Sequence, residues 1–62
     1  MINPKDVEVV GKKQVGIKMS EKSDIFFIIE LPNSANSKIV KLWYNIEDAR
    51  TFVSIYNEKL ID

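Results

Sequence analysis

Two strand-length segments that are apolar at nearly every position constrain this fold most. Asp24–Leu31 reads DIFFIIEL and Lys38–Tyr44 reads KIVKLWY. β-branched and aromatic residues at this density are typical of strands. The residues between them, Pro32–Ser37, are turn formers, so we expect an antiparallel hairpin. Because successive side chains in a strand point to opposite faces, this hairpin must be apolar on both of its faces.

A change of period after the hairpin predicts a helix over residues 46–60. Asn45 is a good N-cap, and Asp48 stands three residues later, where a capping-box partner is found. No Gly or Pro interrupts the segment, and Lys59 lies near its end, as the helix dipole prefers. The apolar residues follow the spacing of a single helical stripe: Ile46, Ala49, Phe52, Val53, Tyr56 and Leu60.

Upstream of the hairpin the pattern indicates one or two further strands. Gln14–Met19 alternates in polarity, with Val15, Ile17 and Met19 on one face. Val7–Val10 is a second candidate, turned back at residues 11–13. We therefore expect an α+β fold, a small antiparallel sheet of three or four strands packed on one C-terminal helix. The order is β-β-β-β-α, or β-β-β-α if the first two strands merge. With 62 residues, the chain forms a single domain, 1–62.

One helix can cover only one face of this sheet, so the other face is the candidate binding surface. We assign Val15, Ile17, Met19, Ile25, Phe27, Ile29, Leu31, Val40, Leu42 and Tyr44 to the helix-facing side. Alternation then places five partner-binding candidates on the opposite face: Phe26, Ile28, Ile39, Lys41 and Trp43. A one-residue register error would exchange the residues between faces, but the excess of apolar groups would survive it.

Each part of this assignment has an alternative. Val7–Val10 and Ile2 could fold over the second face, but they offer few residues to cover it. Trp43 could close the core instead of anchoring a partner, although Trp is a frequent interface anchor. The interface interpretation is favoured, because a contiguous apolar patch on a small domain usually marks a binding surface. The expected partner is a second copy of the chain or another protein, and the function a non-enzymatic, regulatory interaction module.

A nucleic-acid-binding domain, for DNA that includes single-stranded DNA, is the second functional hypothesis. Lysines that alternate with aromatic residues on a sheet can contact phosphates while the rings stack on bases. The candidate residues are Lys12, Lys13, Lys18, Lys38 and Lys41. The chain contains a single Arg, however, and Arg makes the contact most used to read guanine. We favour an ordinary solvated surface of Lys and Glu residues over a nucleic-acid-binding site as the explanation of the lysines.

The composition argues against most chemistry. The chain has no His and no Cys, so we expect no structural zinc site, no His-based triad and no thiol catalysis. Asp24 and Glu30 are possible catalytic carboxylates but form no paired motif, and no phosphate-binding glycine loop is present. We expect no enzyme activity, no cofactor and no small-molecule substrate.

Nine basic residues balance nine acidic ones, and no apolar run could span a membrane, so we expect a cytoplasmic protein with no membrane partner. Abundant Ile, Lys and Asn hint at an AT-rich genome such as that of a low-GC bacterium, its phages or a mobile element.

The segment 43–52, WYNIEDARTF, resembles the end of the sheet and the start of the helix in DNA-binding domains of the arm-type integrase and AP2-like kind. Trp43 matches the aromatic residue that ends the last strand, and Asn45 matches the cap. Asp48, Ala49 and Phe52 match the acidic, small and aromatic residues of the helix. The resemblance implies a three-stranded antiparallel sheet followed by one helix, with the outer face of the sheet in the DNA major groove.

Overall fold

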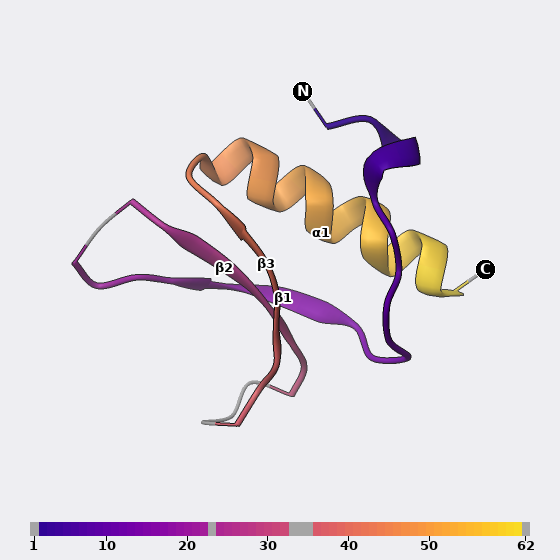
Figure 1. Cartoon of the computed structure of the whole chain (residues 1–62), viewed down its shortest axis with the longest axis horizontal. Coiled ribbons are helices and arrows are strands. Elements are labelled where there is room, and N and C mark those ends of the chain that lie inside the picture. The colour runs from indigo at the N-terminus through magenta and orange to yellow at the C-terminus, as the bar shows by residue number, and fades with distance from the viewer. Residues whose placement is uncertain (1, 23, 33–35, 62) are drawn as a thin grey trace.

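A computed structural model describes residues 2–22, 24–32 and 36–61. It contains a short 3-10 helix, η1 (Pro4–Asp6), three strands and a C-terminal helix. The strands are β1 (Val15–Met19), β2 (Phe26–Glu30) and β3 (Ile39–Trp43), and they form one antiparallel sheet in the order β1-β2-β3. The helix, α1 (Ile46–Ile61), packs against this sheet (Figure 1). The fold is therefore α+β with the order β-β-β-α.

The hairpin of β2 and β3 confirms the pairing expected from the sequence. Each strand is one or two residues shorter at its ends than the apolar runs suggested. Of the predicted turn, residues 33–35 lie outside the described residues. At its base, the Ser37 hydroxyl donates a hydrogen bond to the carbonyl oxygen of Pro32 at 3.0 Å.

Helix α1 begins as its sequence predicts. The side-chain oxygen of Asn45 accepts hydrogen bonds from the backbone N–H groups of Glu47, at 2.8 Å, and Asp48, at 3.4 Å. These bonds satisfy two of the N–H groups that every helix leaves without an internal partner. One stripe of the helix, with Ala49, Phe52 and Tyr56, is buried against the sheet.

The core lies between the sheet and α1. Its buried members are Val7, Val15, Ile28, Ala49, Phe52 and Tyr56. Aromatic rings run through it, with centroids 5.8 Å apart from Trp43 to Phe52 and again from Phe52 to Tyr56. Pairs at this separation add attraction beyond the area they bury.

The N-terminal segment packs on α1 and is not a strand. Figure 1 shows it crossing the C-terminal half of the helix. The Lys59 ammonium donates hydrogen bonds to the carbonyl oxygens of Pro4 and Val7, and the N–H of Val10 donates to the Tyr56 hydroxyl at 3.2 Å. Val7 is only 2% exposed, within the core. Of the two orders left open by the sequence, the one with a fourth strand at Val7–Val10 is therefore excluded, because helix side chains rather than strand pairing hold these residues.

The assignment of sheet faces was wrong for β2 and for residues 41–43 of β3, and right for Ile39 and Val40. Paired residues of neighbouring strands share a face, and Ile17 pairs with Ile28, which is fully buried in the core. Phe26 pairs with Trp43, and both pack against the same core. Phe26, Ile28 and Trp43 thus lie on the helix-facing side rather than on the outer side. The exchange arose because β2 is apolar on both faces, so alternation alone did not fix its orientation.

Candidate interaction surface

The face of the sheet that points away from α1 carries a row of apolar side chains across β2 and β3. The register groups Gly16, Ile29 and Ile39 in one cross-strand row and Lys18, Phe27 and Leu42 in the next. We call this surface the outer sheet face and define it by seven residues: Gly16, Lys18, Phe27, Ile29, Leu31, Ile39 and Leu42. None of its five large apolar residues belongs to the core cluster beneath the helix. The apolar part lies on β2 and β3, whereas β1 contributes a glycine and a lysine.

Exposure differs strongly across the outer sheet face. Ile39 is 56% exposed and Leu31 37%, whereas Ile29 on the central strand is 4% exposed. Leu31 covers Gly16: a Cβ atom placed on Gly16 would lie 3.2 Å from Cδ2 of Leu31. Glycine at this position therefore gives Leu31 room to pack flat on the sheet. The outer sheet face is therefore a flat apolar surface from which the Ile39 side chain projects.

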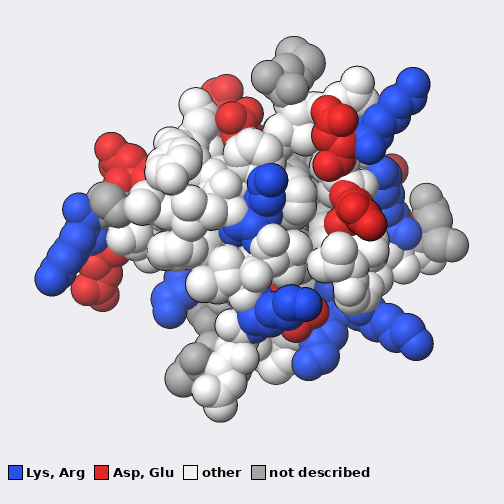
Figure 2. Space-filling view, in the orientation of Figure 1, with Lys and Arg blue, Asp and Glu red and all other residues white. Residues whose placement is uncertain are grey.

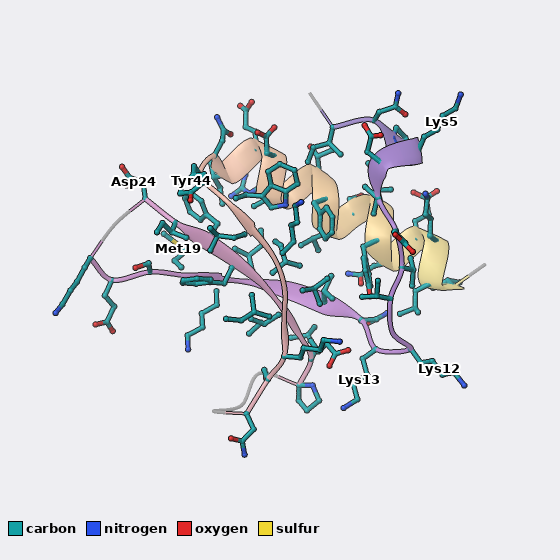
Figure 3. All side chains as sticks on the ribbon, viewed as in Figure 1. Lys5, Lys12, Lys13, Met19, Asp24 and Tyr44 are labelled. Carbon is teal, nitrogen blue, oxygen red and sulfur yellow. The ribbon has the colours of Figure 1, made fainter. Side chains whose placement is uncertain are left out.

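The apolar surface of the outer sheet face extends past the ends of β2 and β3. Continuing the alternation by one residue puts Ile25 and Tyr44 on the same side, and Tyr44 is 71% exposed. Figure 3 shows Tyr44 at the end of the molecule that also holds Met19 and Asp24, away from Lys12 and Lys13. The apolar surface thus runs most of the length of the hairpin.

Among the described residues, nothing covers the outer sheet face. The one segment that the sequence offered as a cover, Val7–Val10, is held on the helix side by Tyr56 and Lys59. An apolar face without a covering layer is the feature that distinguishes this domain from an ordinary two-layer fold.

The structure brings together only part of the predicted partner-binding set. Ile39 lies on the outer sheet face, as predicted. Lys41 is exposed, but it pairs with Ile28 and so lies on the other side of the sheet, with its ammonium 5.3 Å from the centre of the Trp43 ring. The other three residues of the set lie on the core side of the sheet: Phe26, Ile28 and Trp43. Trp43 therefore closes the core, which was the alternative to its role as a partner anchor. Its indole Nε1 is buried and has no hydrogen-bond partner within the described residues.

Four residues of the outer sheet face were missed as binding candidates: Phe27, Ile29, Leu31 and Leu42. The alternating apolar pattern was the available signal, and it is equally strong on both faces of β2. The register shift between Ile28 and Ile29 adds a second obstacle, because β3 gains one residue there and Val40 turns into the core side. A bulge of this kind leaves no clear mark in the sequence.

The five candidate lysines do not share one surface. Lys18 lies on the outer sheet face, whereas Lys38 and Lys41 lie on the opposite side of the sheet. Lys12 and Lys13 are exposed in the turn that precedes β1 (Figure 3). On the side drawn in Figure 2, basic side chains are spread among acidic and uncharged ones rather than gathered into one basic patch. This distribution gives little support to a nucleic-acid-binding platform.

Of the two candidate catalytic carboxylates, Asp24 precedes β2 and Glu30 is the last residue of β2. They are six positions apart, which corresponds to about 20 Å of extended chain. No group of three or more Asp or Glu residues in the described part of the chain could hold a metal ion.

Neither helix in the described residues has the length and hydrophobicity that a membrane span requires.

Comparison with known proteins returns no family model, no curated protein and no solved structure that matches the chain.

Proposed function

We propose that this protein is a small non-enzymatic interaction module that binds protein through the outer sheet face. The observation that carries the proposal is the apolar outer sheet face, on which Leu31 and Ile39 are exposed and Phe27 and Leu42 are half-buried. Helix α1 and the N-terminal segment both lie on the opposite side of the sheet. Ile29 is already buried, whereas the other four side chains keep apolar surface that a partner can contact.

The chemistry of the face favours protein over nucleic acid. Lys18 is the only charged residue in its defined set, and its central positions are aliphatic or a single Phe. A phosphate backbone needs several cations on one surface, whereas the centre of a protein interface is depleted of charge and enriched in apolar side chains. The face matches the second description.

The size of the face limits how much of an interface one copy can supply. Three strands at a spacing of about 4.8 Å and five residues at about 3.3 Å give a flat footprint of roughly 240 Å². A standard protein interface buries about 800 Å² on each partner. One copy of the chain thus supplies under a third of a standard interface, so we expect a stable interface to need a larger surface.

Capture from an extract of the source cells tests this proposal. The immobilised chain is compared with an Ile39→Ser variant, whose substitution lies at the most exposed point of the outer sheet face. We expect the variant to lose at least tenfold of the captured partner. Ile61→Ser is the matched control, because Ile61 is 76% exposed but lies at the end of α1. Equal capture by both variants, or equal loss, would show that the outer sheet face is not the binding surface.

A further inference from the structure

The edge of the sheet along β1 is capped by a side chain at its first residue, Val15. The amide of Asn57, on α1, accepts a hydrogen bond from the N–H of Val15 at 2.9 Å and donates one to its carbonyl oxygen at 3.0 Å. The Asn57 amide thus occupies the position that a neighbouring strand would take beside Val15. Another chain cannot pair with Val15 without displacing it.

The other edge, along β3, is open over its C-terminal half. The N–H of Glu30 donates to the carbonyl oxygen of Lys38 at 3.0 Å, so Glu30 bonds toward β3. Residues of an antiparallel ladder alternate in the direction of their backbone groups. Ile28 therefore also bonds toward β3, and its partner Lys41 bonds back into the sheet. Leu42 follows Lys41, so its N–H and C=O point away from the sheet. No group in the described residues forms a hydrogen bond with them.

We propose that β3 pairs with β3 of a second copy of this chain, antiparallel and with Leu42 opposite Leu42 on a two-fold axis. The proposal rests on the proposed function, because it names one partner and the manner in which the outer sheet face is enlarged. In this register Lys41 of each copy stands opposite Trp43 of the other. Lys41 already lies over its own Trp43 ring at 5.3 Å, so a second ring adds a favourable cation–π contact rather than a repulsion.

Charge complementarity supports the same arrangement. Antiparallel pairing brings the Lys38 end of one β3 beside the residues that follow β3 in the other copy. These include Glu47 and Asp48, the acidic residues of the first turn of α1. Lys38 pairs with Glu30 and Lys41 with Ile28, so both lysines are on the helix side of the sheet, as α1 is. Neither lysine forms an ion pair within the described residues.

Other self-pairings fit less well. A shift by two residues toward the start of β3 would set Lys41 opposite Lys41, and like charges directly opposite are destabilising. Pairing along the whole of β1 would have to displace the Asn57 amide from Val15. The bulge beside Val40 limits regular pairing to the residues around Leu42. The edge is therefore short and specific.

The consequence is a larger binding surface. Two three-stranded sheets joined at β3 form one continuous sheet with both helices on the same side. The outer sheet faces then merge into one surface of roughly 480 Å², more than half of the 800 Å² or so that a standard interface requires from one partner. Pairing of two copies thus doubles the surface that one copy offers.

Cysteine cross-linking tests the proposal, because the chain has no native cysteine. Across a two-fold axis at Leu42 the two Leu42 Cα atoms are about 5.5 Å apart, within disulfide range. The two Ile39 Cα atoms are about 20 Å apart in the same register. We expect Leu42→Cys to form a disulfide-linked dimer under mild oxidation at least tenfold faster than Ile39→Cys. Random collision predicts the reverse order, since Ile39 is the more exposed residue.

Sedimentation of the unmodified chain from 1 µM to 1 mM completes the test, and we expect a monomer–dimer equilibrium in this range. A monomer throughout, or cross-linking of Ile39→Cys as fast as Leu42→Cys, would overturn the proposal. If the chain is monomeric throughout but still captures a partner, and the Ile39→Ser variant does not capture it, the proposed function stands. Only the pairing of two copies is then refuted. If the chain dimerises through Leu42 but Ile39→Ser captures normally, the pairing stands and the proposed function is refuted.

Discussion

A pair of matched substitutions tests which side of β2 and β3 forms the core. Ile28 is fully buried and Ile39 is 56% exposed, although the two residues are of one type and lie on neighbouring strands. Ile→Val removes one methyl group at each site. In a packed core this loss costs about 1 kcal/mol, the transfer free energy of the group plus a small cavity. At Ile39 the neighbouring solvent fills the space, so we expect a loss of under about 0.3 kcal/mol.

Urea unfolding, followed by the fluorescence of Trp43 and by far-UV circular dichroism, measures the difference. For a domain of this size the free energy of unfolding falls by about 1 kcal/mol for each molar urea. Ile28→Val should therefore lower the midpoint by about 1 M, and Ile39→Val should leave it within about 0.3 M. The conservative change suits a small domain, since Ile→Ala at position 28 costs 2–5 kcal/mol or so, which can equal its whole stability. Equal shifts, or a larger shift for Ile39→Val, would refute the assignment of faces.

Three further outcomes are expected. Asn57→Leu removes both hydrogen bonds to Val15 and should cost about 2 kcal/mol in the same urea assay, whereas an unchanged midpoint would mean that the edge of β1 needs no cap. Lys59→Met should speed hydrogen exchange at the amide of Val10, because the ammonium no longer holds the carbonyl oxygen of Val7; exchange as slow as in the parent chain would contradict this role. Single-stranded DNA at low salt should leave the fluorescence of Trp43 unchanged, and a salt-dependent change would instead favour the nucleic-acid hypothesis.

Local signals in the sequence predicted the elements of this fold well. The start of α1 follows from Asn45, whose side chain bonds to backbone groups only two and three residues away. The hairpin follows from two β-rich runs around a turn. Such features depend on neighbours in the chain, so one sequence is enough to find them.

The orientation of β2 could not be predicted in the same way. Alternation identifies a core face only when the other face is polar, and Phe26, Phe27, Ile28 and Ile29 offer no such contrast. The pairing of Ile17 with Ile28 settles the choice, and that pairing depends on the whole sheet. Val7 is a similar case, because its burial depends on contacts with a helix about fifty residues later in the chain. The apolar excess itself was predictable, but the residues that form the outer sheet face were not.

The central claim is that one face of the sheet is apolar and uncovered, and solvent access to methyl groups tests it most directly. A neutral, soluble gadolinium chelate broadens the NMR signals of methyl groups that it can approach. In a dilute sample, at the lowest concentration that gives usable spectra, the account predicts strong broadening for Ile39 and Leu31 and little for Ile28 and Val15. Methyl signals of Ile39 and Leu31 as protected as those of Ile28 would contradict it.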